Sequence, residues 1–177
     1  MDQVILVDSN DNELGKMEKL EAHEKGLLHR AFSIFLFNSS GEMLVQQRAD
    51  SKYHSPGLWT NACCSHPAPN ETVMDASQRR LVEELGISTF LAHTFYFEYR
   101  TEFENGLIEH ELDHVLVGYT NENPILNASE AKAFQWISVE NLLQDMRNSP
   151  EKYTIWFKII LNQHFEKIQK ELCHARM

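Results

Sequence analysis

The order of apolar and polar residues predicts strands through the middle of the chain and helices at its end. A nearly continuous apolar run at 31–37 predicts a strand buried on both faces. A turn at 38–41 follows, and it leads into a returning strand at 43–47. The segment 16–24 fits a helix or a polar strand, and both stay open. Other strands are predicted at 58–64 and 134–137, and a short apolar run at 4–7 ends in a turn cluster at 8–12.

Helix start and stop residues mark three helices. The clearest helix spans 71–85, with Asn70 as the N-cap and Gly86 closing its C-terminal end. A short helix begins at Ser138, and a long amphipathic helix is predicted at 156–172.

The segment between the first and second helices predicts a long β-hairpin. Its strands lie at 91–102 and 107–119, and they are joined around Asn105-Gly106, a dipeptide that favours tight hairpin turns. Together these elements predict an α/β (α+β) chain with strands through its middle and helices at its end. The length of 177 residues suggests one compact domain over 1–177, with a core at about 28–140 and C-terminal helices at 138–173.

Charge and cysteine content narrow the classes of function. The formal net charge of −10 disfavours broad nucleic-acid binding, and an anionic substrate would need a local basic cluster. No apolar run approaches the roughly 20 residues that cross a bilayer, and no secretory signal is expected. Three cysteines (Cys63, Cys64 and Cys173) are too few for a disulfide framework. We therefore expect a protein of the reducing cytoplasm with no membrane and no nucleic-acid partner.

The helix at 71–85 carries a charged motif. Glu71 is followed by Arg79-Arg80 and then by Glu83-Glu84-Leu85-Gly86-Ile87. This resembles the Nudix box, a helix that presents carboxylates to a metal-bound diphosphate. Ser65 stands where the box has its first Gly, and Arg80 stands where it has a metal-binding Glu. A solvated, salt-bridged helix face is the alternative interpretation.

The segment after residue 60 offers a thiol next to an imidazole. On extended backbone, Cys64 and His66 point the same way and Cys63 points to the opposite face, where we expect core packing. A reactive thiol beside a metal-ligating histidine is a useful chemical pair. A small buried cysteine and a surface histidine are the alternative.

The predicted hairpin offers two carboxylates on one face. Glu109 and Glu111 lie two residues apart, and like charges this close are unfavourable unless a cation bridges them or one holds a proton. If the hairpin is symmetric about Asn105, Tyr99 lies opposite Glu111, where its phenol can hold or relay a proton. His110 should face away. One face of an exposed strand is the alternative.

Histidines before the first buried strand form a weaker pattern. His23 and His29 are six residues apart, a poor same-face spacing on a helix, so they are a ligand pair only if the segment is a loop. The histidines outside this pair and His66, including His54, are expected to be incidental.

Taken together, these motifs resemble the type I isopentenyl-diphosphate isomerases, a diverged Nudix-fold family. The resemblance covers most of the chain and implies a Nudix-like fold of mixed β-sheets flanked by helices. It implies interconversion of isopentenyl and dimethylallyl diphosphate with divalent metal and without flavin or nicotinamide. The matching segments are His23, His29-Arg30-Ala31-Phe32, Trp59-Thr60-Asn61, Cys64-Ser65-His66-Pro67, Arg79-Arg80, Glu83-Glu84-Leu85-Gly86 and Ile108-Glu109-His110-Glu111.

The resemblance also implies a role for each site residue. Cys64 and Glu111 match the paired acid/base residues with Tyr99 beside Glu111, and Glu84 matches the ligand of a second metal, usually Mg²⁺, that grips the diphosphate. Trp156 matches an indole near the carbon skeleton of the substrate. The matches to the metal site are His23, His29, His66, Glu109 and Glu111, which suit Zn²⁺, Mn²⁺ or Mg²⁺. The matches to the diphosphate-binding cations are Lys19, Arg48, Lys52 and Arg80.

Moving the double bond requires adding one proton to the alkene and removing another. The tertiary carbocation between these steps calls for a dry, closed site with an aromatic face. We expect the partner to be a small-molecule diphosphate and the protein to be a monomer or weak dimer. The alternatives are a Nudix-type diphosphate hydrolase, which leaves Cys64 and Tyr99 without a role, and a non-catalytic protein with a structural metal.

Overall fold

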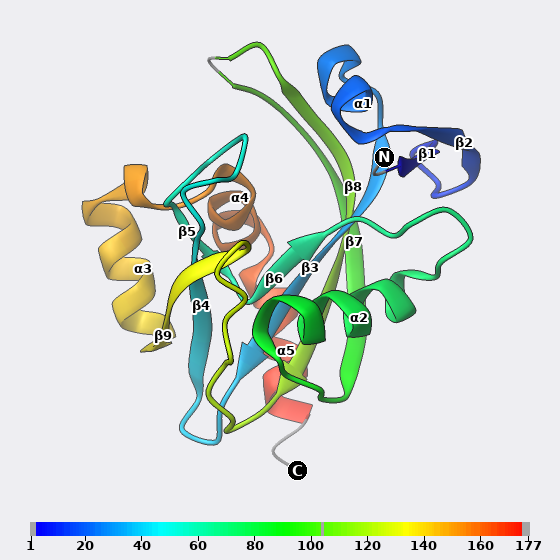
Figure 1. The fold of residues 1–177 in the computed structure, drawn as a ribbon. Coiled ribbons are helices and arrows are strands. Elements are labelled where there is room, and N and C mark those ends of the chain that lie inside the picture. Colours follow the sequence, from blue (N-terminus) through cyan, green and yellow to red (C-terminus); the bar gives the residue numbers. More distant parts are fainter. Residues whose placement is uncertain (1–2, 104, 175–177) are drawn as a thin grey trace.

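The apolar run at 31–37 lies in the central strand of the fold, β3 (His29–Phe37), which is buried along most of its length. The computed structural model describes residues 3–103 and 105–174 (Figure 1). In this part of the chain β3 pairs in parallel with β8 (Ile108–Tyr119) and antiparallel with β6 (Cys63–Ser65). The sheet is therefore mixed, as predicted.

The remaining strands extend this sheet from both sides of β3. On one side, β1 (Gln3–Val7) pairs with β2 (Glu13–Glu18) and touches β3. On the other side, β4 (Glu42–Arg48) pairs with β5 (Trp59–Asn61) and with β9 (Ala131–Ser138). The outer hairpin strand, β7 (Leu91–Glu102), pairs with β8 in the predicted register, which puts Tyr99 opposite Glu111.

Helices cover both faces of the sheet, because successive β3 side chains point to opposite faces. Phe35 and Phe37 pack in a core under α3 (Val139–Asn148), α4 (Ile155–Gln163) and α5 (Phe165–His174). The residues that alternate with them pack in a second core under α2 (Val73–Leu85). This two-sided burial confirms the prediction for the apolar run. The remaining helices are α1 (Lys19–Lys25) and the short 3₁₀ helix η1 (Pro150–Lys152).

Four local predictions need correction or completion. The segment 16–24 contains both a strand and a helix, the two predicted alternatives, because β2 ends at Glu18 and α1 begins at the next residue. The strand expected at 58–64 is two short strands, β5 and β6, on either side of Ala62. The helix expected at 156–172 is interrupted at His164 between α4 and α5. The strand β4 returns from β3 but meets it only at Phe37 and Met43, because its other pairs go to β5 and β9.

The start of α2 also differs from the prediction. Thr72, not Asn70, is the N-cap, and its hydroxyl accepts a hydrogen bond of 3.1 Å from the Asp75 amide. Asn70 has a φ of 68°, so it forms the preceding turn. The Gly86 C-cap was predicted correctly, with a φ of 65°.

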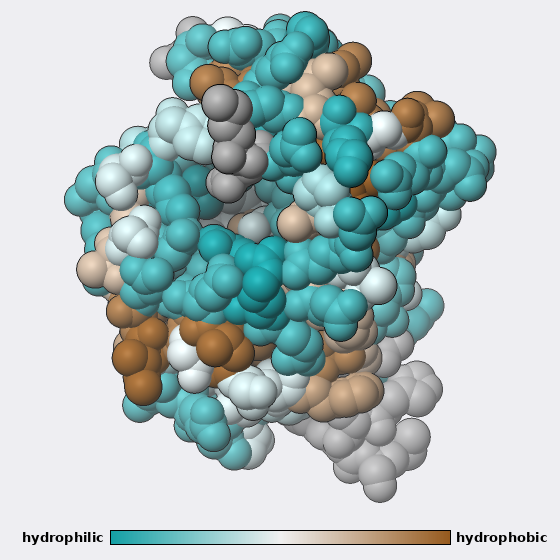
Figure 2. All heavy atoms as spheres, turned by 45° about the vertical axis from the view of Figure 1, so that its right-hand side comes forward, coloured by the Kyte–Doolittle hydropathy of each residue, from teal (hydrophilic) through white to brown (hydrophobic). Residues whose placement is uncertain are grey.

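The surface in Figure 2 is mainly hydrophilic, with apolar residues in separate patches. This agrees with the burial of most large apolar side chains in the two cores. Among the residues that the structure describes, no helix combines the length and the apolar character that crossing a membrane requires.

Candidate active site

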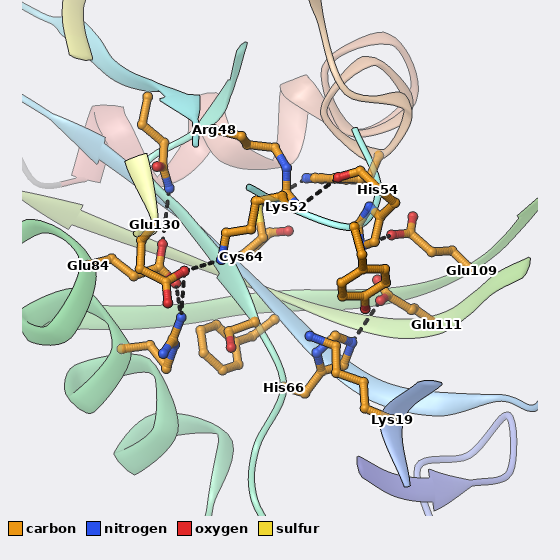
Figure 3. Close-up of a pocket in the computed structure, with 17 residues that line it drawn as sticks. Lys19, Arg48, Lys52, His54, Cys64, His66, Glu84, Glu109, Glu111 and Glu130 are labelled. Carbon is orange, nitrogen blue, oxygen red and sulfur yellow. Dashed lines mark hydrogen bonds and ion pairs between the residues drawn. The ribbon is translucent and has the colours of Figure 1, made fainter. Parts of the chain in front are cut away.

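One pocket collects most of the predicted site residues, and it lies where β3, β4 and β6 come together (Figure 3). Its basic lining residues are Lys19, Arg48, Lys52 and Arg80. Its other predicted lining residues are Cys64, His66, Glu84, Glu109, Glu111 and Trp156. His23, His29 and Tyr99 are buried behind the lining, where they contact it. The structure therefore brings every predicted site residue to one place.

Three histidines and a carboxylate converge at one end of the pocket. His29 on β3 is the direct register partner of Glu111 on β8, and its Nε2 lies 3.6 Å from Glu111 Oε1. His66 follows β6, and its Nε2 lies 2.9 Å from the same oxygen. His23, on α1, completes a set in which each residue offers one ligand atom within 4.8 Å of the others. The predicted histidine pair thus meets through tertiary structure, with one member on a helix and the other on a strand.

The protonation of these imidazoles fits a metal ion. The Nδ1 atoms of His23 and His29 lie 2.6 and 2.8 Å from the backbone oxygens of Lys19 and Leu27. Nδ1 therefore carries the proton and donates it, which leaves Nε2 with a lone pair. Within the described chain, both Nε2 atoms are buried without a hydrogen-bond partner. Buried polar atoms without partners are rare in proteins, and outer-sphere bonds of this kind orient metal-ligating histidines. The cluster therefore suits a divalent cation.

The carboxylates behave as a coupled pair. Burial alone would raise the pKa of Glu111, but the adjoining imidazoles of His29 and His66 outweigh it and hold the pKa well below its usual range. Burial and the charge of Glu111 raise the pKa of Glu109 well above its usual range. The Tyr99 hydroxyl donates to Glu111 at 2.6 Å and lies 3.1 Å from Glu109. The pair can therefore hold one proton beside one negative charge.

Cys64 lines the pocket beside Trp156, and its thiol has hydrogen-bonding neighbours. Its thiol donates to Asn61 Oδ1 at 2.9 Å, and the Trp156 indole N–H donates to Sγ at 3.1 Å. Burial raises the pKa of the thiol to about 12, and Asp113 adds to this effect. The resting side chain is therefore a neutral thiol that holds its proton. Cys63 packs in the second core as predicted.

Basic residues and carboxylates alternate at the other end of the pocket. Arg80 contacts Glu84 at 2.6 Å and Glu130 at 3.2 Å, and Lys52 pairs with the same Glu130 oxygen. Glu84 also accepts a hydrogen bond of 3.1 Å from Gln46. Sequence reasoning missed Glu130, because it lies outside the Nudix-like helix and the hairpin.

His54 also belongs to the pocket, so the expectation that it is incidental was wrong. Its Nε2 lies 3.6 Å from Glu109 Oε1. His23, His54 and Glu109 form a second set with ligand atoms within 4.8 Å of one another. No spacing in the sequence could have found His54, because it lies in an irregular loop between β4 and β5. By contrast, His110 binds Glu98 and the Gly26 carbonyl, away from the carboxylate pair, as predicted.

Comparison with known proteins shows the family of the chain. The NUDIX domain family matches residues 27–157, which is more than half of the chain. The isopentenyl-diphosphate Delta-isomerase 2 of Aromatoleum aromaticum is 50% identical over 162 residues, covering 92% of this chain and 86% of that protein. The isopentenyl-diphosphate Delta-isomerase of Pectobacterium atrosepticum is 49% identical over 157 residues, covering 89% and 88%.

Solved structures share the fold at lower identity. The crystal structure of DR0079 from Deinococcus radiodurans superimposes with a TM-score of 0.68 at 21% identity, covering 82% of this chain and 89% of that one. A C. elegans Ap4A hydrolase complex gives a TM-score of 0.56 at 16% identity, covering 82% and 98%. The fold is thus that of the Nudix structures, while the sequence follows one branch of them: the chain belongs to the Nudix family and, within it, to the isopentenyl-diphosphate Delta-isomerases.

Proposed function

We propose that this chain interconverts isopentenyl and dimethylallyl diphosphate by protonation and deprotonation through a tertiary carbocation, which supplies isoprenoid precursors. The supporting observation is that Cys64 and Glu111 line one pocket whose other end is cationic. Two proton-handling groups of different chemistry, set beside an anion-binding region, are what a double-bond shift in an alkenyl diphosphate requires.

The basic end of the pocket would hold the diphosphate as an anchor. Lys52 and Arg80 at this end, with Lys19 beside His66 on the pocket lining, offer cationic donors that suit phosphate oxygens (Figure 3). Arg48 donates to the carbonyls of His54 and Ser55 and stacks over Trp156 at 5.3 Å, so it also fixes the pocket wall. In this proposal the diphosphate stays attached to the carbon skeleton through the reaction.

Proton transfer would use Cys64 and Glu111, which both line the pocket. The Cys64 thiol holds a proton, and Glu111 with Tyr99 forms a second site that accepts or returns one. Adding a proton at C4 of isopentenyl diphosphate moves the double-bond electrons into the new C–H bond and leaves a cation at C3. Loss of a proton from C2 then forms the C2=C3 double bond. One proton enters and one leaves, so the enzyme returns to its starting charge.

The surroundings of Cys64 would protect the cation from water. Trp156 is 3% exposed, and its indole presents an aromatic face without a nucleophilic lone pair. A cation over such a face gains up to about 2 kcal/mol when it is desolvated. The indole N–H is already bound to Cys64 and Thr60, so the ring orientation is fixed.

Divalent cations would complete the site in two places. His23, His29, His66, Glu109 and Glu111 would hold Zn²⁺, Mn²⁺ or Mg²⁺, and Glu84 would hold Mg²⁺ against the diphosphate. When bound, these ions supply positive charge that offsets the buried carboxylates and the diphosphate. The protein residues themselves provide the orientation, the proton transfer and the exclusion of water. No flavin or nicotinamide is part of the proposal.

A Nudix-type diphosphate hydrolase is the alternative activity. It is less favoured, because Arg80 replaces a carboxylate that hydrolysis needs and because Cys64 and Tyr99 would have no role. The products distinguish the two activities. Isopentenyl diphosphate incubated with the enzyme in deuterated water should give dimethylallyl diphosphate with deuterium in the methyl group formed at C4. Release of phosphate with no labelled isomer would contradict the proposal.

The anchoring role of Arg80 gives a separate prediction. Arg80→Met should raise KM by about 10- to 100-fold with a smaller change in kcat, because hydrogen bonds to charged groups contribute about 1.5–3 kcal/mol and about 1.4 kcal/mol is tenfold. Steady-state kinetics measures both constants. Arg79→Met is the matched control, because Arg79 pairs with Glu71 and Glu83 on the neighbouring helix face. An unchanged KM in Arg80→Met would show that the diphosphate binds elsewhere.

We further propose that the enzyme works in the cytoplasm as a monomer or weak dimer, on a small-molecule diphosphate and without a nucleic-acid or membrane partner. Cys63 and Cys64 are free thiols, which supports a reducing compartment. Size-exclusion chromatography with light scattering measures the assembly state.

A further inference from the structure

The loop that carries His54 is held firmly against the pocket. The guanidinium of Arg48 donates to the His54 and Ser55 carbonyls at 3.1 and 3.2 Å. The His54 ring stacks on Phe103 with centroids 5.5 Å apart and meets the edge of Trp156 at 5.8 Å. These contacts fix the ring between the hairpin and α4, and Figure 3 shows it beside Glu109.

The ring offers nitrogen atoms in a buried place. His54 is only 9% exposed, and among the described residues its Nδ1 has no hydrogen-bond partner. Its other nitrogen, Nε2, lies 3.6 Å from Glu109 Oε1. Two ligands of one ion, each about 2.0–2.2 Å from it, lie at separations of this order. The contact therefore has the spacing of two groups that share a cation.

His23 connects this contact to the main cluster. It belongs to the set with His29, His66 and Glu111 and also to the set with His54 and Glu109. Its Nδ1 is used by the Lys19 carbonyl, so only Nε2 is free to bind a metal. One nitrogen lone pair can coordinate only one metal ion. The two sets are therefore two sides of one site, and they do not bind two ions at once.

We propose that His54 is a further protein ligand of this metal centre. Four imidazoles and two carboxylates then surround one ion: His23, His29, His54, His66, Glu109 and Glu111. Six donors of this kind suit an octahedral ion such as Mn²⁺ or Co²⁺ better than a four-coordinate structural Zn²⁺. With its shell filled by protein, the ion would position Glu109 and Glu111 and leave the substrate to the basic end of the pocket.

Metal binding tests this inference without substrate. The full-length protein is stripped with a chelator and titrated with Mn²⁺ by calorimetry, and Co²⁺ spectra report the coordination number. His54→Ala and His54→Phe should both bind Mn²⁺ about 10- to 100-fold more weakly, which is the range seen even for lost outer-sphere partners. Their Co²⁺ absorption should intensify as the coordination number falls. The wild type should bind one ion per chain at this centre.

The phenylalanine variant separates ligation from packing, because it keeps the aromatic ring against Phe103. If His54→Phe binds Mn²⁺ as tightly as the wild type, or if the wild type binds a second ion that His54→Ala loses, the inference is wrong. His93→Ala is the matched control, since His93 is an exposed histidine outside the pocket whose Nε2 lies 2.9 Å from His114 Nδ1. The inference rests on the proposed metal centre, and the readout needs no turnover, so failure of the isomerase proposal would be seen separately in the labelling experiment.

Discussion

Cys64→Ala should lower kcat by about 10²- to 10⁴-fold, which is the usual contribution of a positioned acid or base. The thiol is the proton-bearing group beside Trp156 in the pocket, and burial holds its pKa at about 12. Alanine cannot hold or move a proton. The change should appear in kcat measured at saturating isopentenyl diphosphate, because the basic end that anchors the diphosphate is unaltered.

The fold should survive this change, because each partner of the thiol has another partner. Asn61 Oδ1 also accepts from the Thr60 hydroxyl at 3.0 Å, and the Trp156 N–H also donates to that hydroxyl at 3.0 Å. The loss of stability should therefore be about 0.5–1.5 kcal/mol, the usual net worth of one hydrogen bond. Thermal unfolding monitored by circular dichroism measures it.

Cys63→Ala is the matched control for the thiol. Cys63 is the neighbouring residue, but it is fully buried in the second core and does not line the pocket. Its replacement should cost some packing stability and leave kcat within a few-fold of the wild type. A Cys64→Ala enzyme with near wild-type kcat would remove this thiol from the proton-transfer step.

Glu111→Gln should lower both the metal content and the turnover, each by a factor of at least about 10. Glu111 receives hydrogen bonds from His66 and Tyr99 and faces His29 at 3.6 Å, so it is the common partner of the ligands and of the phenol. Glutamine keeps the size of the side chain but removes its charge. Elemental analysis of the purified variant and steady-state kinetics measure the two losses.

The matched control for Glu111 lies on the same hairpin. Glu98→Gln alters a carboxylate that binds His110 at 3.0 Å on the opposite face of the hairpin, so metal content and kcat should both stay at wild-type levels. A Glu111→Gln enzyme that retains its metal and its turnover would refute both roles of Glu111.

The local sequence pattern was sufficient to predict those features of the structure that neighbouring residues determine. The hairpin register is set by the tight turn at Asn105-Gly106, so the position of Tyr99 opposite Glu111 could be predicted and is correct. The apolar run of β3 and the Gly86 cap were predictable for the same reason. The N-cap of α2 was misplaced because Asn70 and Thr72 are both good caps, and tertiary structure selects between them.

Contacts between distant segments could not be obtained in this way. The parallel pairing of β3 with β8 joins segments far apart in the chain, and no local pattern specifies it. The site residues outside the hairpin could be grouped only through the family resemblance. That resemblance gave no place to His54 or Glu130, which reach the pocket from irregular segments. Their position depends on how the loops fold over the sheet.

The register of β3 against β8 has a consequence for assembly of the native state. His29 and Glu111 are direct partners, so a slip of one residue would turn one of them to the opposite face. A cation that needs both side chains can bind only the correct alignment. Metal binding would therefore favour the native pairing of β3 with β8 during folding. It closes a long chain loop and stabilises only the native strand order.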